Sequence, residues 1–264
     1  MITDGPVLLS LSDGIARLTL NRPAAANGLS VELLKAFHEA LMVCHGRADL
    51  RVLVLRGAGP HFCAGGDVKD FASRGDALPD YLREATAYLQ VVSGALARLE
   101  APVVTGVQGF AAGGGGLGLV CASDFVLAGA SAKFLAGATR VGMAPDAGSS
   151  VLLQRLVGFR QATNILLRNP VITAPQALDM GLVTSVSEDD RLDQDIEDLA
   201  RELSRGAPKA LAATKRLLWN GLGLGFEAAL PEEARTVAEL ARTADAKEGL
   251  AAVIEKRQPQ FVGQ

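Results

Sequence analysis

The stretch APVVTGVQGFAAGGGGLGLV, residues 101–120, decides the fold, because a strand, a glycine run and an apolar helix follow one another in it. APVVTGVQG predicts the strand, and the four glycines Gly113 to Gly116 open the helix. Glycine destabilises a helix interior by about 1 kcal/mol relative to alanine. Four in succession therefore indicate that the backbone closely approaches another group here.

The same alternation of strand and helix extends to both sides of this stretch. Upstream, VLLSLSDGIARLTLNRP predicts a hairpin with strands Val7 to Ser10 and Ile15 to Leu20. A helix N-capped by Ser30, the buried strand RVLVLRG and an amphipathic helix from about Asp80 to Leu99 follow. Downstream, residues 124–128 form another strand. This pattern predicts an α/β domain with a largely parallel sheet.

The sequence becomes helical from about Thr173 onward. The expected helices are rich in Ala and Leu and cover residues 174–180, 192–203, 209–220, 230–243 and 245–255. They suit a lid, a packing arm or an oligomer surface, and periodicity alone leaves the three alternatives open.

Composition narrows the classes of function. The 264 residues are 49% hydrophobic, enough for a substantial core, and the formal net charge of -3 gives no basic excess. Binding to nucleic acid or to a membrane is therefore not expected. The N-terminus has no features of a targeting peptide, and three widely spaced cysteines indicate neither disulfides nor a metal site. A cytoplasmic protein is expected.

The glycine run admits three interpretations. Gly113, Gly115 and Gly118 fit the GxGxxG pattern of dinucleotide sites, but the acidic residue expected about twenty positions later is missing. Alternatively, N–H groups at the start of the helix stabilise an oxygen that becomes negative during a reaction. HFCAGGDVK supplies a second such loop, in which Asp67 is expected to stabilise a helix end. The third interpretation is close helix–strand packing without a ligand.

Four segments together carry a resemblance to a known family. They are NRPAAANGLS, HFCAGGDVK, VTGVQGFAAGGGGLGL and RVGMAPDAGSSVLLQRLVG, in this order. With them, the sequence resembles the crotonase superfamily, also called the enoyl-CoA hydratase/isomerase family, along essentially its whole length. The resemblance implies a crotonase-like α/β spiral of ββα units over residues 1–200. It also implies a C-terminal α-helical region, residues 201–264, that forms a lid or assembles homotrimers, or dimers of trimers.

The resemblance further implies an acyl-CoA thioester substrate, with no other cofactor and no metal. The N–H groups of Gly66 and Gly114 would polarise the thioester carbonyl and hold its enolate. Coenzyme A would contact the backbone of Ala25, Ala64 and Val68. Lys256 would reach the nucleotide phosphate of a coenzyme A bound to a neighbouring subunit. By the same analogy, residues 71–79 and the helix 80–99 border the acyl pocket.

The acidic residues depart from the pattern of the family's hydratases. Leu117 and Ala138 occupy the positions of the two glutamates that activate water in those enzymes, and neither can transfer a proton. Asp146 matches an aspartate of certain isomerases in the family, which include ring-epoxide (epoxyphenylacetyl-CoA) and dienoyl-CoA isomerases. Its apolar neighbours are expected to raise its pKa.

The sequence therefore predicts an isomerase in which Asp146 alone shuttles a proton and Leu117 forms an apolar wall. Several alternatives stay open. Asp146 could instead cap the helix that follows it. A hydratase would need another carboxylate, Asp67 or Asp70, and a hydrolase would need a glutamate near Ala138. The chain could also be a non-catalytic acyl-CoA-binding protein.

Overall fold

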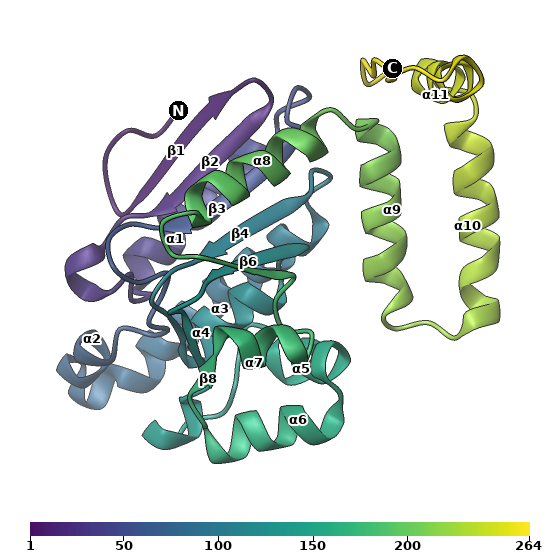
Figure 1. Cartoon of the computed structure of the whole chain (residues 1–264). Helices are drawn as coiled ribbons and strands as arrows, with labels where there is room; N and C mark the ends of the chain where they lie inside the picture. Colours follow the sequence, from purple (N-terminus) through teal and green to yellow (C-terminus); the bar gives the residue numbers. More distant parts are fainter.

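A six-stranded sheet forms the centre of the molecule, and the computed structural model describes all 264 residues. The strands lie in the order β1 (Val7–Ser12), β2 (Ile15–Leu20), β3 (Val52–Gly57), β4 (Val103–Val107), β6 (Phe125–Gly129) and β9 (Ser185–Ser187). Only β1 and β2 are antiparallel, and they form the expected hairpin. The prediction of an α/β protein with a largely parallel sheet is confirmed (Figure 1).

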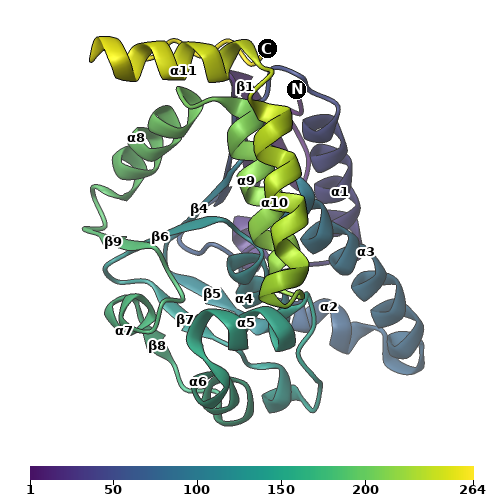
Figure 2. The ribbon, with the colours of Figure 1, turned by 90° about the vertical axis from the view of Figure 1, so that its right-hand side faces the viewer.

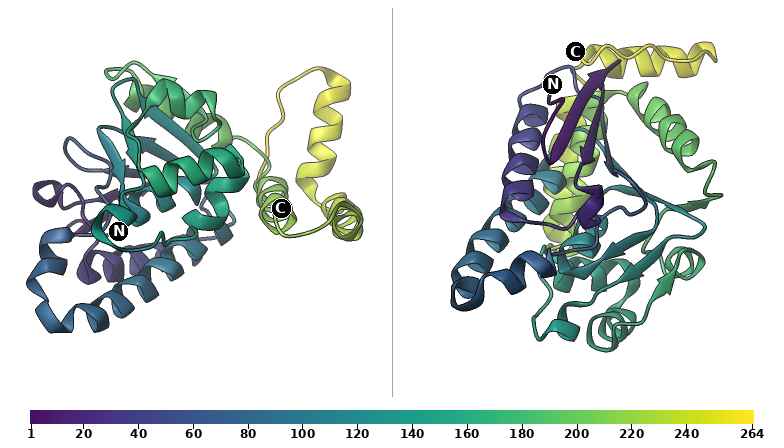
Figure 3. Two further views of the ribbon diagram at one scale, coloured as in Figure 1. Left: turned by 90° about the horizontal axis from the view of Figure 1, so that it is seen from below. Right: turned by 90° about the vertical axis from the view of Figure 1, so that its left-hand side faces the viewer.

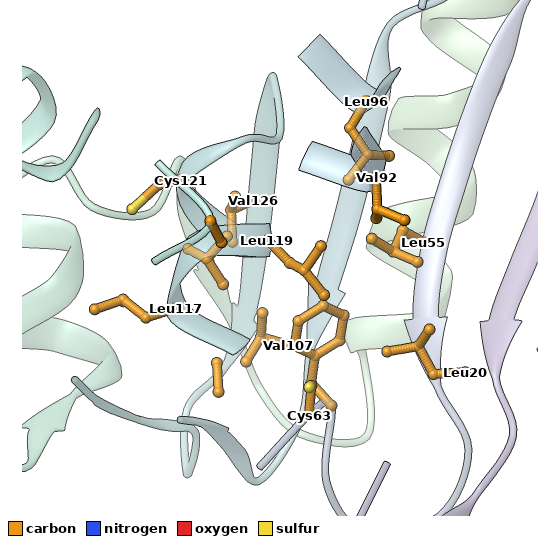
Figure 4. Packing of buried hydrophobic residues seen from close by; sticks show 14 of the residues in the cluster. Leu20, Leu55, Cys63, Val92, Leu96, Val107, Leu117, Leu119, Cys121 and Val126 are labelled. Carbon is orange, nitrogen blue, oxygen red and sulfur yellow. The ribbon is translucent and has the colours of Figure 1, made fainter. Parts of the chain in front are cut away.

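Helices cover both faces of this sheet. Helix α8 (Leu192–Ser204) lies across one face, where Ile196 and Ala200 pack against Val54 and Leu127 (Figure 1). The other face packs against α1 (Val31–His45), α3 (Leu78–Arg98) and α4 (Gly113–Cys121), and Figure 4 shows part of this larger core. Burial on both sides explains why β3 and β4 are apolar without alternation.

Two predicted helix starts are confirmed by their caps. The Ser30 hydroxyl accepts a hydrogen bond from the Leu33 N–H of α1 at 3.3 Å. The Asp67 carboxylate accepts one from the Asp70 N–H at 3.1 Å, and so caps α2 (Val68–Ser73). The structural role expected for Asp67 is therefore present.

A small second sheet was not expected from the sequence. It contains β5 (Phe110–Ala112), β7 (Lys133–Leu135) and β8 (Ile172–Thr173), in that order. Helices α5 (Ser149–Val157), α6 (Phe159–Thr163) and α7 (Ala174–Asp179) lie beside it (Figure 2). Strands of two or three residues are too short to produce a detectable periodicity, because one alternation needs about four.

The last three helices project from the rest of the chain as an arm. These are α9 (Pro208–Gly221), α10 (Phe226–Leu240) and α11 (Ala244–Glu255), and Figure 3 shows them to one side of the rest of the chain. With α7 and α8 they account for the five helices predicted after Thr173. Helix α10 begins four residues earlier than expected and contains Pro231 in its interior. The division of the chain into a catalytic core of residues 1–200 and an oligomerisation or lid region of residues 201–264 stays a prediction.

None of the helices combines the length and apolar character that crossing a bilayer requires.

Candidate active site

The two glycine loops singled out in the sequence lie against each other. Cys63 and Ala111 form a parallel bridge, in which the Ala112 N–H donates to the Cys63 oxygen at 2.8 Å. Further along, Gly65 and Gly113 have left-handed φ values of 88° and 68°. A Cβ on Gly65 would lie 2.7 Å from the Gly113 Cα, so the contact requires glycine.

This contact places two backbone N–H groups at one site. Gly114 is the second residue of α4, and the first four N–H groups of an α-helix have no acceptor within the helix. Gly66 follows the second loop, and its N–H donates to no acceptor in the chain. The structure thus brings together the two glycines that the sequence predicted as partners, although 48 residues separate them.

Asp146 lies directly over Gly114. A Cβ added at Gly114 would overlap the Asp146 Oδ1 atom, so the carboxyl group occupies space that only glycine leaves free. Asp146 Oδ1 is buried and has no hydrogen-bond partner. Burial disfavours the charged carboxylate and raises the pKa of Asp146, an effect that a backbone hydrogen bond partly offsets.

The alternative role of Asp146 as a helix cap is not found. Helix α5 begins after Gly148, which is its N-cap, and no side chain caps it. Asp146 contributes its backbone oxygen to this turn, accepting hydrogen bonds from the N–H and hydroxyl of Ser149 at 2.9 and 2.7 Å. The carboxyl group is therefore not used to stabilise the helix.

Gly66, Gly114 and Asp146 all line one cavity of about 620 Å³. Most of its lining is apolar, and Asp146 and Arg140 are its only ionisable residues. Arg140 donates a hydrogen bond to the backbone oxygen of Asn169 at 2.5 Å, which ties its guanidinium to the surface. Asp146 is accordingly the single carboxyl group that a molecule in this cavity would meet.

Neither Asp67 nor Asp70 lines the cavity. Asp67 pairs with Arg22 at 3.0 Å in addition to capping α2. Asp70 pairs with Arg74 and accepts a hydrogen bond from the Tyr81 hydroxyl. Both carboxylates thus help to hold α2 in place, and neither belongs to the cavity wall.

Leu117 and Ala138, which occupy the positions of the two glutamates of the family's hydratases, have different surroundings in the structure. Ala138 lines the cavity, whereas Leu117 is fully buried and does not. Figure 4 shows Leu117 with Leu119 and Cys121 among the packed side chains of the core. The expectation that Leu117 forms a wall of the pocket is therefore wrong, because the side chain turns into the core instead.

Both segments expected to border the acyl pocket contribute to this cavity, and its role as the acyl pocket stays a prediction. Phe71 and Ala72 of α2 line the cavity, and so does one face of α3, made of Leu78, Leu82, Ala85, Thr86 and Leu89. The sequence did not identify these side chains as the wall. The spacing of i, i+4 and i+7 along α3 was the available signal, but it does not distinguish a cavity wall from a packed core.

The predicted contacts to coenzyme A lie in two places. Ala64 and Val68 line the cavity, and Ala25 does not. Ala25 is adjacent in the chain to Ala26, whose oxygen accepts a hydrogen bond from the Ala64 N–H at 3.0 Å. Lys256 follows α11 on the arm and does not line the cavity. Their contacts to the coenzyme stay predictions.

No group of three or more His, Cys, Asp or Glu side chains is arranged to bind a metal ion. Cys63 lies in the second glycine loop, and burial raises the pKa of its thiol to about 12. This thiol stays protonated, so it is not a nucleophile at neutral pH.

The fold and the site define an α/β protein with two backbone donors and one carboxyl group around an apolar cavity. Residues 10–264 match the model of a known family, described as "Enoyl-CoA hydratase/isomerase". The chain therefore belongs to the enoyl-CoA hydratase/isomerase family, and its structure has the crotonase fold.

Individual relatives carry different activity names. A protein of Rhodobacter capsulatus named "Probable enoyl-CoA hydratase" is 37% identical, over 96% of both chains. The 1,2-epoxyphenylacetyl-CoA isomerase of Escherichia coli is 32% identical, over 97% of this chain and 98% of its own. A crystal structure of an enoyl-CoA hydratase from Bacillus anthracis superposes with a TM-score of 0.93 at 29% identity, covering 98% of this chain and all of that one (100%).

Proposed function

We propose that the protein is an acyl-CoA isomerase with a single-aspartate proton shuttle. The observation that carries this proposal is the Asp146 carboxyl group, the only one on the cavity wall, with a buried and unpartnered Oδ1 over Gly114. A group that must both accept and donate a proton works best when its pKa lies near the operating pH. Burial shifts the pKa of Asp146 in that direction.

In the proposed reaction the Gly66 and Gly114 N–H groups bind the thioester oxygen. The Asp146 carboxylate removes a proton from a saturated carbon next to the thioester carbonyl, or next to a double bond conjugated with it, and the electron pair moves onto that oxygen as an enolate. The same carboxyl group then returns the proton to another carbon, so the double bond shifts and the mass is unchanged. One oxyanion donor typically contributes a factor of about 10²–10³ to kcat.

The shortage of proton-transfer groups favours isomerisation over hydration. Hydration needs one group to activate water and another to protonate the substrate, and Leu117 and Ala138 leave the two glutamate positions without either. The name of the Rhodobacter relative keeps hydration as the second candidate. The Escherichia coli relative is named an isomerase of an epoxide, and in this chain the rearrangement of such a strained ring would use the same two donors and the same carboxyl group.

The experiment that tests the proposal offers a panel of enoyl-, dienoyl- and aryl-CoA thioesters to the wild type and to Asp146→Asn. Products are identified by mass spectrometry and NMR. We expect products of unchanged mass, and a fall of about 10²–10⁴-fold in kcat for the variant. Asp193→Asn is the matched control, because the Asp193 side chain is 84% exposed and pairs with Arg56 on the surface.

Two outcomes would contradict the proposal. A product heavier by the mass of water would establish a hydratase with an unrecognised set of acids. Tight binding of every thioester without turnover, unchanged in Asp146→Asn, would establish a non-catalytic acyl-CoA-binding protein.

A further inference from the structure

The peptide that carries the Gly66 N–H is held from its opposite side. The oxygen of Gly65 accepts a hydrogen bond from the Leu29 N–H at 2.7 Å. A trans peptide is planar, so its C=O and N–H point in opposite directions. Fixing the Gly65 oxygen on Leu29 therefore aims the Gly66 N–H away from Leu29, on the side where it has no acceptor in the chain.

Asn27 holds the segment to which Leu29 belongs. Its side chain is fully buried (0% exposed) and makes hydrogen bonds with four backbone groups. The amide Nδ2 donates to the oxygens of Ala58, His61 and Phe62 at 2.9, 2.8 and 3.1 Å, and Oδ1 accepts from the Arg22 N–H at 2.9 Å. One side chain thus joins the turn of residues 22–29 to the loop that leads into Gly66.

Main-chain bonds fix the register of these two segments. The Ala64 N–H donates to the Ala26 oxygen at 3.0 Å, and the Cys63 thiol donates to the Asn27 oxygen at 3.3 Å. Asn27 has a left-handed φ of 55°, a conformation that Asn and Gly adopt far more readily than other residues. Asparagine is accordingly suited to both demands, since it combines this conformation with amide donors and an acceptor.

We infer that Asn27 is a positioning residue for the oxyanion donor Gly66. It does not line the cavity and touches no substrate; it acts by fixing the loop of residues 58–66 against Leu29, which sets the direction of the Gly66 N–H. The inference rests on the proposed function, in which this N–H binds the thioester oxygen. A donor displaced by about 1 Å costs roughly 10²-fold in rate.

Ligand binding tests this role without requiring turnover. The probes are an acyl-CoA thioester and the thioether of the same acyl chain, which lacks the carbonyl oxygen. Calorimetric titration of the wild type is expected to show the thioester bound about tenfold more tightly or better, because two hydrogen bonds reach its oxygen. In Asn27→Gly, which keeps the backbone conformation, this preference should shrink at least threefold, and kcat on an active thioester should fall by about 10²-fold.

Asn169→Gly is the matched control. Asn169 is also buried (3% exposed) with a φ of 52°, and its side chain bonds to the Gly137 N–H and the Thr139 hydroxyl, each at 2.6 Å. Gly137 lines the cavity but supplies neither donor, so the loss of these bonds should lower thermal stability and weaken the binding of thioester and thioether alike, which leaves the preference between them unchanged. If Asn27→Gly does not fold, Asn27→Ser retains one donor and one acceptor and is expected to lose part of the preference.

The outcomes separate the two proposals. If the wild type prefers the thioester and the Asn27 variants keep this preference, Asn27 does not position Gly66, and the proposed function is unaffected. A wild type that binds thioester and thioether equally overturns the oxyanion hole itself, and the role of Asn27 with it.

Discussion

At the scale of single residues, the site depends on a carboxyl group that the fold leaves without a partner. Asp146 Oδ1 is buried and lies where a side chain at Gly114 would be. A buried carboxylate oxygen without a hydrogen bond lowers the free energy of unfolding, and proteins retain such groups mostly where chemistry needs them. Asp67 and Asp70 provide the contrast, because both are paired and both serve structure.

The raised pKa of Asp146 leads to a prediction for activity against pH. The base form is needed to remove a proton, so kcat/KM should fall as the pH drops through the pKa of Asp146. That pKa lies above the ordinary value of 3.8. A pH–rate profile for the isomerisation measures it, and an acidic limb at or below 3.8 would show that burial does not control this group.

Stability should depend on pH with a defined sign. The folded protein binds the Asp146 proton more tightly than the unfolded chain, so this group's contribution to stability is present below the unfolded pKa and is lost as pH rises through the folded one. Asp146→Asn stays neutral and should therefore have a higher Tm than the wild type at pH 7. The difference should vanish below pH 3.8, which calorimetric scans across pH can check.

Gly114→Ala should inactivate the enzyme by displacing Asp146. The added Cβ would overlap Oδ1, so either the carboxyl group or the start of α4 must shift. We expect kcat to fall about 10²–10³-fold, the usual effect of losing an oxyanion donor. Gly221→Ala is the control, since nothing lies within 4 Å of its added Cβ, and kinetics of both variants on one thioester make the comparison.

At the scale of elements, the short helix α2 closes one side of the cavity. Phe71 packs so closely on Gly66 that a Cβ there would lie 2.5 Å from its ring. A six-residue helix is not stable alone, and α2 is held by the Asp67 cap and by contacts to its neighbours. Tyr81 of α3 supplies the central contact, because its hydroxyl donates to Asp70 and accepts from the Val31 N–H at 3.0 Å.

Tyr81→Phe should weaken the attachment of α2 to α3, because it removes the hydroxyl that contacts α2 and leaves every residue of α2 unchanged. The lost hydrogen bonds are expected to lower the free energy of unfolding by about 1–3 kcal/mol. They should also speed amide exchange in residues 68–73 and raise KM. Hydrogen-exchange mass spectrometry and denaturant unfolding measure these effects. Tyr88→Phe removes a hydroxyl that makes no hydrogen bond in the structure, so equal effects of both substitutions would refute the role of Tyr81.

At the scale of the whole molecule, the arm of α9 to α11 is attached through a small polar contact. Lys215 of α9 is 6% exposed and pairs with Asp124 at 2.7 Å, while the Trp219 indole donates to the same carboxylate at 2.8 Å. Large apolar side chains elsewhere on the arm face solvent, including Phe226, Val253 and Ile254 at 79%, 78% and 80% exposed. Exposed apolar side chains mark an interaction site where they form a contiguous patch, and Val253 and Ile254 are adjacent on α11.

The predicted homotrimer or dimer of trimers can be tested on this arm. Native mass spectrometry and light scattering should give a mass of three or six times that of the chain. The double variant Val253→Glu and Ile254→Glu, which introduces charge at the most exposed apolar positions of α11, should shift the mass toward monomer. A wild type that is monomeric at micromolar concentration would contradict the prediction, whereas an unaffected oligomer would place the interface elsewhere.

The sequence-based predictions were accurate for features that neighbouring residues determine, and less so for features that depend on contacts between distant parts of the chain. Helix caps such as Ser30 and the hairpin that contains strand Ile15 to Leu20 are local features, and they were predicted correctly. The closeness of the two glycine loops also could be inferred, because ends of successive parallel strands meet, whereas Gly66 and Gly114 were identified within them only through the resemblance to the family. The direction of Leu117, the small second sheet and the four hydrogen bonds of Asn27 depend on contacts across the chain, and no local pattern specifies them.

The overlap between Gly114 and Asp146 restricts the evolutionary paths open to this protein. A side chain gained at position 114 displaces the carboxyl group at position 146 or the start of α4, so the effect of one substitution depends on the other. Gly114→Ala therefore costs less after Asp146→Gly, which removes the overlapping atoms, than before it. Paired substitutions at these two positions would mark branches of the family that have abandoned chemistry at this aspartate.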